Sequence, residues 1–296
     1  MMGAKKYATA AAFRRALEDR LQGIAVKEGV DLQRLRRQVA FDRLLARLFQ
    51  AKHPLALPWV LKGGYAMELR IRTARTTKDI DLTLRSVSCL REKRDDKKHR
   101  ALLEKFQEVV AVSADDFFAF TIEEAISELD AAPQGGARFP VEARLDGRVF
   151  VGFRLDAGIG DAVIEPLETV AGRDWLGFAG IASPALYMIS CEQQFAEKLH
   201  AYTSPRNESA NSRVRDLVYM VLLIQSGTMT ADKTAGAVRI TFDHRKTLAL
   251  PKVLPRPPAE WQKAYSALPR EWRISWQIDD AFLVLRTFAE SIAGRS

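Results

Sequence analysis

The 296 residues are 47% apolar and 28% charged, a composition typical of a globular protein with one large domain or two closely packed ones. The 45 basic residues exceed the 37 acidic ones, and the net charge of +8 favours a polyanionic partner without requiring one. The two cysteines, Cys89 and Cys191, lie too far apart in sequence to suggest a disulfide framework or a cysteine-rich zinc site. The chain shows no apolar run typical of a membrane span or a signal peptide, so we expect a cytoplasmic protein without a membrane partner.

The first part of the chain predicts two helices followed by a strand, helix, strand unit. Apolar residues recur at helical spacing from about residue 10 to 50 and predict two amphipathic helices. A short buried strand is predicted at residues 59–61, a helix at 65–71 and a second strand at 79–84. The charged stretch 91–100 then leads into a further helix.

The middle of the chain predicts β-structure and the C-terminal part predicts helices. Residues 141–145 and 149–155 alternate as strands and flank Asp146-Gly147, a dipeptide that suits a tight hairpin turn. The proline-rich stretch 251–258 predicts a loop between C-terminal helices. Helical patterns after Gly180 fall at residues 190–202, 214–225 and 278–292.

The strongest local signal combines a glycine pair with two aspartates on a strand. Asp79 and Asp81 stand at i and i+2, so their side chains share one face of the strand, with Cα atoms roughly 6.5 to 7 Å apart. Magnesium prefers oxygen ligands, usually one or two carboxylates with waters and phosphate oxygens. Gly63 and Gly64, ahead of a helix, would let backbone N–H groups approach a triphosphate. A tight turn and a solvated strand edge are the alternatives, which the order and spacing of the two motifs disfavour.

Three further residues are candidates with open alternatives. Asp156 would be a third carboxylate, allowing two metal ions to be held, or it would cap a turn at Ala157-Gly158 where its strand ends. Lys198 would offset triphosphate charge or be an ordinary exposed helix lysine. Asp216 follows a predicted polar loop at 207–215, so the pattern alone indicates a cap or first-turn acid.

Four motifs follow one another along the chain: Lys62-Gly63-Gly64, Thr77-Lys78-Asp79-Ile80-Asp81, Glu197-Lys198-Leu199-His200-Ala201 and Arg213-Val214-Arg215-Asp216-Leu217. In this order and spacing they resemble the AbiEii/AbiGii nucleotidyltransferase toxin family, especially its mycobacterial MenT branch, from about residue 10 to 290. The resemblance implies an α+β fold, with a polymerase-beta-like nucleotidyltransferase core of mixed sheet and helices and a helical C-terminal part. We expect the first domain at residues 1–180 and a helical domain that completes the active site at 181–296.

The resemblance also implies roles for individual residues. The expected metal ligands are Asp79, Asp81 and Asp156. The expected catalytic residues are Asp79, Asp81, Lys198 and Asp216. The expected nucleotide-binding residues are Lys62, Gly63, Gly64, Arg213 and Arg215. For Arg213 and Arg215, contact with RNA and simple helix packing are the alternatives. At Gly64 many relatives carry a serine, so a side-chain phosphate contact is not expected there.

The activity implied by the resemblance is that of the toxin of a bacterial toxin–antitoxin pair. Relatives of the MenT kind add nucleotides to the 3′ end of tRNA and thereby block translation. The implied cofactors and partners are two Mg²⁺ ions, a nucleoside triphosphate donor, tRNA and an antitoxin encoded nearby. The alternatives are nucleotide transfer to a protein or small molecule, and a non-catalytic RNA-binding or antitoxin-binding module, against which the intact acidic and basic motifs argue.

A basic region around the acidic strand is a candidate contact for the tRNA backbone, whereas a solvated charged helix is the alternative for residues 91–100. The members of this region are Arg70, Arg72, Arg75, Lys78, Arg91, Lys93, Arg94, Lys97, Lys98 and Arg100. Thr77 carries a separate hypothesis. A phosphate on its hydroxyl would add negative charge beside the metal ligands and could switch the site off.

Overall fold

The computed structural model describes residues 7–50, 57–71, 77–85, 95–129, 132–204, 210–246, 249–251, 253–268 and 275–293. Two compact units are built from interleaved segments of the chain. The first unit takes Met1–Leu61, Thr76–Gly160 and Glu168–Met188, and the second takes Lys62–Arg75, Asp161–Leu167 and Ile189–Ser296. The division predicted between residues 180 and 181 stays a prediction. Among the helices of the described ranges, none has the length and apolar composition needed to cross a bilayer.

The two predicted N-terminal helices are confirmed, and both begin at side-chain caps. Helix α1 (Ala10–Glu28) starts where Thr9 Oγ1 accepts a hydrogen bond from the backbone of Ala12, and it ends at Gly29 in the left-handed conformation. Helix α2 (Leu32–Leu48) starts at Asp31, whose carboxylate accepts a hydrogen bond from the backbone N–H of Arg34.

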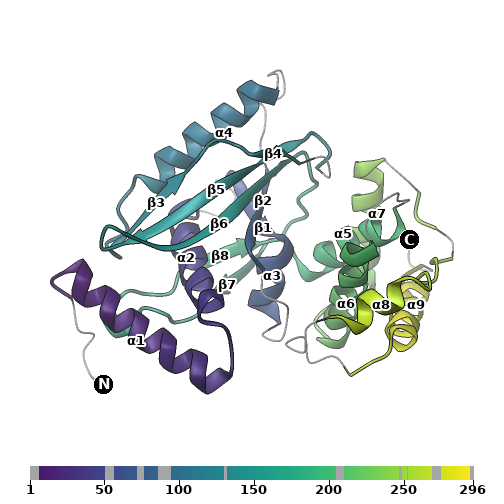
Figure 1. Ribbon diagram of the computed structural model, residues 1–296. Helices are drawn as coiled ribbons and strands as arrows, with labels where there is room; N and C mark the ends of the chain where they lie inside the picture. The colour runs from purple at the N-terminus through teal and green to yellow at the C-terminus, as the bar shows by residue number, and fades with distance from the viewer. Residues whose placement is uncertain are drawn as a thin grey trace. The chain divides into compact units, whose positions relative to one another are not determined.

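A mixed sheet forms the body of the first unit, as the predicted fold class requires. The described strands are β1 (Trp59–Lys62), β2 (Asp79–Leu84), β3 (Phe118–Ile122), β4 (Ser127–Glu128), β5 (Gly136–Leu145), β6 (Arg148–Ile159), β7 (Glu168–Ala171) and β8 (Ala185–Met188). Their order is β3-β5-β6-β2-β1-β8-β7, with β4 paired to β5 (Figure 1). The pairs β2/β6 and β1/β8 are parallel, whereas β3/β5, β5/β6 and β7/β8 are antiparallel.

The predicted hairpin at Asp146-Gly147 is confirmed. Both turn residues have positive φ, 54° and 67°, which matches the right-handed twist of the flanking strands. A β-bulge interrupts the β5/β6 pairing, because Ala143 pairs with Val151 while Arg144 pairs with Val149. Phe150 is therefore the extra residue of β6.

Strand β6 is longer than the sequence pattern predicts. It continues through Asp156 to Ile159, with Ala157 paired to Leu82 and Gly158 paired to Thr83 in the parallel ladder. The predictions that Asp156 closes its strand and that Ala157-Gly158 forms a turn are therefore wrong. Pairing with β2 and β5 on both sides keeps this segment extended.

Three helices cover one face of the sheet: α1, α2 and α4 (Asp95–Val110) (Figure 1). Phe41 of α2 meets Phe153 of β6 edge to face at 4.9 Å between ring centroids, and Phe106 of α4 meets Phe139 of β5 at 5.6 Å. The helix predicted to follow residues 91–100 is thus confirmed from Asp95 onward. The polar residues of β2 and β6 are left on the opposite face of the sheet.

A buried ion cluster ties α2 to the segment before β3. Asp116, only 1% exposed, accepts hydrogen bonds from Arg47 Nη1 and Nη2 at 2.9 and 2.8 Å and from Arg43 Nε at 2.6 Å. Burial alone would raise the pKa of Asp116, but the hydrogen bonds and charges of Arg47 and then Arg43 hold that pKa below its ordinary value. The cluster is ionised in the folded protein at neutral pH.

The second unit is helical, as predicted for the C-terminal part. Its helices are α3 (Gly63–Arg70), α5 (Cys191–Thr203), α6 (Ala210–Gln225), α7 (Ala231–Arg245), α8 (Trp261–Ser266) and α9 (Ile278–Ala293) (Figure 1). They share one core, in which Phe195, Leu217 and Leu285 are fully or almost fully buried. The predicted loop at 207–215 is wrong from Ala210 onward, where α6 has begun. Helix α7 was not predicted.

Candidate active site

Three aspartates lie side by side on the face of the sheet opposite the core helices. In β2, Ile80 and Leu82 are fully buried, and Asp79 and Asp81, which alternate with them, are half-buried. Successive strand residues point to opposite faces, so the two aspartates share one face. Strand β6 pairs Asp156 directly with Asp81, about 4.8 Å away across the ladder. The structure thus brings together the three carboxylates that the sequence predicts as metal ligands.

Two guanidinium groups lie on the same face. Arg138 of β5 pairs with Asp156 and donates two hydrogen bonds to it, from Nε to Oδ1 at 2.8 Å and from Nη2 to Oδ2 at 2.7 Å. Arg154 lies beside Asp79, with Nε 3.3 Å from Oδ1. The hydrogen bonds to Asp156 outweigh partial burial and, with the charges of Asp156, Asp79 and Asp81, raise the pKa of Arg138 above its ordinary value. Sequence reasoning did not identify Arg138.

The donor set of this face fits a hard divalent cation. Among the described residues of this cluster, three carboxylates against two guanidinium groups leave an excess of negative charge, and carboxylate oxygens are the ligands that Mg²⁺ prefers. Clustered carboxylates repel one another unless cations lie among them. Asp79 and Asp81 can supply oxygens to such an ion, whereas both oxygens of Asp156 are engaged by Arg138.

Thr77 holds the backbone just before the acidic strand. Its Oγ1 accepts a hydrogen bond from Asp79 N at 3.3 Å and donates one to Asp79 O at 3.1 Å. Thr77 therefore stands two residues before Asp79, and its hydroxyl contacts the backbone of that metal-ligand candidate. The hypothesis that Thr77 is modified stays a prediction.

A second cluster of predicted residues forms between α5 and α6 in the helical unit. Asp216 Oδ1 lies 3.0 Å from Lys198 Nζ in an ion pair, and Asp216 Oδ2 accepts a hydrogen bond from Arg213 Nη1 at 2.5 Å. The Lys198 ammonium also lies 5.3 Å from the ring centroid of Tyr219. Asp216 is buried and comes after the first turn of α6, which begins at Ala210, so the interpretation as a cap is wrong. The interpretation of Lys198 as an ordinary exposed lysine is wrong as well, because its side chain is only 24% exposed.

Arg213 has donor capacity beyond its contact with Asp216. Burial lowers the pKa of Arg213 below its ordinary value, although the charge of Asp216 opposes the shift. Its Nε is buried and has no hydrogen-bond partner among the described residues. Arg215, the other basic residue of this motif, is half-buried on the same helix.

Lys62 lies among carboxylates of its own unit. Its ammonium contacts Asp161 directly and lies 3.7 Å from Glu197 Oε2, while Arg245 Nη2 donates to Asp161 at 2.8 Å. Burial lowers the pKa of Lys62, but Glu197 and then Asp161 raise it above its ordinary value. Its predicted role in nucleotide binding stays a prediction. The role of Asp161 in this network was not foreseen, because it follows β6 in a loop whose side chains the sequence pattern does not place.

The glycine pair begins helix α3. Gly63 has φ of 64°, in the left-handed region that favours glycine, and its carbonyl accepts a hydrogen bond from Gln194 Nε2 at 2.7 Å. Gly64 follows in the first turn, where backbone N–H groups lack partners within the helix. Such N–H groups suit an anion, which agrees with the predicted role of the pair without testing it.

The predicted basic region lies only partly within the described residues. The Arg70 guanidinium donates to the carbonyl of Ile189 and to the side chain of Gln194, so it serves contacts inside the second unit. Arg100 on α4 is 82% exposed and lies 3.2 Å from Glu104. Also described are Lys78, Lys97 and Lys98, whereas the positions outside the described residues are Arg72, Arg75, Arg91, Lys93 and Arg94.

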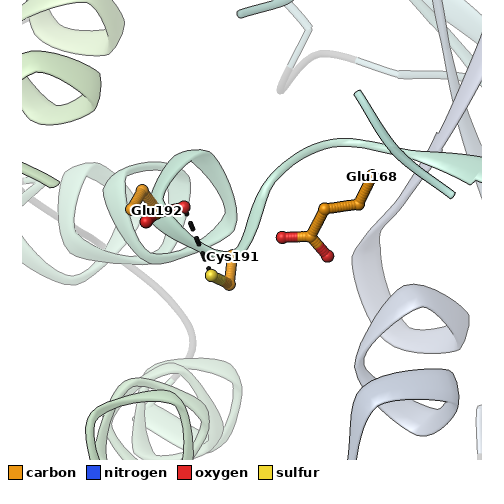
Figure 2. Close-up of side chains that lie close together, drawn as sticks. All are labelled: Glu168, Cys191 and Glu192. Atoms are coloured by element: carbon orange, nitrogen blue, oxygen red, sulfur yellow. Dashed lines mark hydrogen bonds between the residues drawn. The ribbon is translucent and has the colours of Figure 1, made fainter. Parts of the chain in front are cut away.

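Cys191 is a buried cysteine at the start of α5. Figure 2 shows its sulfur pointing to Glu192, and the Sγ to Oε2 distance is 3.2 Å. Glu168, drawn in the same figure, belongs to β7 of the first unit. Cys89 lies outside the described residues.

Comparisons with known proteins agree with the resemblance found in the sequence. A family model described as "Nucleotidyl transferase AbiEii toxin, Type IV TA system" matches residues 43–282. No curated protein matches the chain. Among solved structures, MenT4, a nucleotidyltransferase toxin from Mycobacterium tuberculosis H37Rv, is similar at 16% identity with a TM-score of 0.52. That alignment covers 98% of this chain and 99% of the other, and it confirms the predicted α+β fold.

Proposed function

Because the chain belongs to the AbiEii family of nucleotidyltransferase toxins of type IV toxin–antitoxin systems, we propose that it transfers a nucleoside monophosphate from a nucleoside triphosphate to the 3′ end of tRNA. The observation that carries this proposal is the group of three aspartates, Asp79, Asp81 and Asp156, on one face of β2 and β6. Transfer joins the terminal ribose oxygen of tRNA to the α-phosphorus and releases pyrophosphate. A modified 3′ end cannot be aminoacylated, so translation stops.

In this proposal the sheet supplies the metal site. When bound, Mg²⁺ would lower the pKa of the attacking hydroxyl and offset the charge of the triphosphate. Asp79 and Asp81 point from one strand to the same face and are the residues that would hold a first ion. Asp156 lies opposite Asp81 on the neighbouring strand and is the ligand that would hold a second ion near the ribose. Magnesium dependence is thus proposed from the chemistry of the donor set.

The helical unit supplies positive charge in the same proposal. Phosphoryl transfer depends on positioning and electrostatics more than on covalent help from the protein. Lys198 and Arg213 would contact the triphosphate. Asp216 would position both side chains, since its carboxylate lies 3.0 Å from Lys198 Nζ and 2.5 Å from Arg213 Nη1. An acid with two cationic partners keeps their side chains ordered when no nucleotide is bound.

The partners follow from the family and the acceptor. A type IV toxin has a cognate antitoxin, which we propose is encoded next to this gene. The net charge of +8 suits a tRNA acceptor, whose phosphates would meet basic residues such as Lys97 and Arg100 on α4. A tRNA acceptor also places the proposed reaction in the cytoplasm.

Incubation of the purified protein with Mg²⁺, total tRNA and each labelled nucleoside triphosphate tests the proposal. Asp79→Ala should lower transfer at least about a hundredfold, because a metal ligand is lost, while Asp279→Ala, at an exposed position on α9, should leave it unchanged. Circular dichroism should show both variants folded. Label on tRNA with wild type and Asp279→Ala supports the proposal. Label on a protein or small molecule instead would transfer the acceptor role to that molecule, and no transfer to any acceptor would refute the proposed activity.

A further inference from the structure

We propose that Arg138 is a positioning residue that holds Asp156 in the metal-free protein and must release it before a second metal ion binds there, so that this ion binds together with the triphosphate. The inference rests on the proposed metal-dependent transfer. It concerns a residue of β5 that lies outside the four sequence motifs and that only the strand pairing brings to the site.

The geometry of the Arg138 contact carries the proposal. Nε and Nη2 donate in parallel to the two oxygens of Asp156, at 2.8 and 2.7 Å, which is the fork arrangement that makes arginine–carboxylate pairs strong. The Asp156 side chain is 9% exposed, so water screens this pair little. Both residues stand on paired strands, opposite each other in the ladder. A cation that approached Asp156 would meet a positive charge already bound to both oxygens.

The guanidinium of Arg154, described on the same face, makes a weaker contact. Arg154 approaches Asp79 through one atom at 3.3 Å, and its side chain is 45% exposed. Exposed ion pairs of this kind contribute little and are easily replaced. A metal ion at Asp79 and Asp81 therefore has a weak competitor, whereas an ion at Asp156 has a strong one. The two metal positions are unequal for this reason.

Binding of a triphosphate would allow Arg138 to release Asp156. Arginine binds phosphate oxygens with the same two-pronged geometry that it uses for carboxylates. A triphosphate held by the first ion would offer Arg138 a second partner, and rotation of the guanidinium toward it would expose the oxygens of Asp156. Binding of the second ion and of the nucleotide are then coupled, since each favours the same arrangement of Arg138.

Counting of bound Mn²⁺ by electron paramagnetic resonance, with and without a non-hydrolysable nucleoside triphosphate analogue, tests the proposal. Without nucleotide, wild type should bind one ion with a second at least about tenfold weaker, and Arg138→Met should tighten the second site about tenfold or more. With the analogue, the second-site constants of wild type and Arg138→Met should agree within about twofold. Arg144→Met is the matched control, because Arg144 lies on the same strand, is exposed, and pairs with half-buried Glu142 at 2.6 Å.

Two results would overturn the proposal. The first is a second-site constant in Arg138→Met that equals that of wild type without nucleotide. The second is an equal tightening in Arg154→Met, which would assign the effect to net charge and not to the fork on Asp156. If Arg138→Met does not fold, Arg138→Lys keeps the charge but lacks the fork, and an unchanged second site in that variant would also overturn the proposal. Transfer to tRNA by wild type, together with a second-site constant that Arg138→Met leaves unchanged, would overturn this inference and leave the proposed function standing.

Discussion

A fall in pH from 7 to 4 should destabilise the helical unit through His200. This residue of α5 is 4% exposed, and its ring meets that of Phe242 edge to face at 4.9 Å between centroids. Burial and then the charges of Arg245 and Arg213 lower the pKa of His200 to about 4. The folded protein therefore keeps this imidazole neutral in a range where the unfolded chain protonates it.

The direction and size of the effect follow from proton linkage. Because the pKa is lower in the folded state, the stabilisation is fully present above the unfolded value of 6.5 and is lost as the pH falls toward about 4. A tenfold difference in proton affinity corresponds to about 1.4 kcal/mol, so the interval between the two pKa values corresponds to about 3 kcal/mol. The pH dependence of the free energy of unfolding that His200 causes should be confined to the range between about pH 4 and pH 6.5.

Urea denaturation of wild type and His200→Gln at several pH values between 7 and 4 measures the effect. Wild type should lose about 3 kcal/mol more than His200→Gln over this range. His244→Gln is the control, because it removes an imidazole that is exposed on α7. Nuclear magnetic resonance of the imidazole protons reports the pKa directly. Titration of His200 near pH 6.5, or equal losses in wild type and His200→Gln, would refute the reasoning.

Two further substitutions test the packing of the sheet unit. Asp116→Asn should lower the free energy of unfolding by about 3 to 5 kcal/mol, because Arg43 and Arg47 stay buried without their counter-charge. A loss of less than about 1 kcal/mol, measured by urea denaturation, would contradict the stabilising role of this ion cluster. Gly136→Ala should destabilise by more than about 1 kcal/mol, because its Cβ would lie 2.3 Å from the carbonyl oxygen of Ala157, and an unchanged melting temperature would show that the strands separate at no cost.

The parts of the fold that the sequence predicts correctly are those governed by local chemistry. Asp146 and Gly147 tolerate the positive φ that a two-residue hairpin turn needs, so this dipeptide alone predicts the turn. Asp79 and Asp81 alternate with fully buried apolar residues, which identifies both the strand and the face of the pair. In both cases the signal lies within a few residues.

The parts that escape prediction depend on distant partners. Strands β7 and β8 are four residues long and are defined by each other and by β1, so no local pattern distinguishes them from loops. Helix α7 contains Thr234, Gly236 and Thr241, which weaken the helical signal, and packing against α5 stabilises it instead. The sequence pattern predicts the start of α6 too late in the chain, so it assigns Asp216 to the first turn, whereas α6 begins at Ala210.

Arg138 shows the same dependence on long-range pairing. Regular pairing counted from the turn, where Leu145 faces Arg148, would place Arg138 opposite Leu155, a core residue. The bulge shifts the ladder by one, so Arg138 faces Asp156 instead. The extra residue Phe150 therefore determines that Arg138 pairs with Asp156, and no pattern in the sequence predicts the position of this bulge.

The bulge at Phe150 also determines which insertions and deletions the β5/β6 hairpin tolerates during evolution. Since Phe150 has no partner in the ladder, a relative that lacks one residue between the turn and Val151 can pair regularly and still keep Asp156 opposite Arg138. A relative with one residue more needs a second irregularity to keep that pairing. Alignments of such relatives should therefore favour single gaps over single insertions at this point, and the ring of Phe150, 5.3 Å from that of Phe118, is the packing that such a gap gives up.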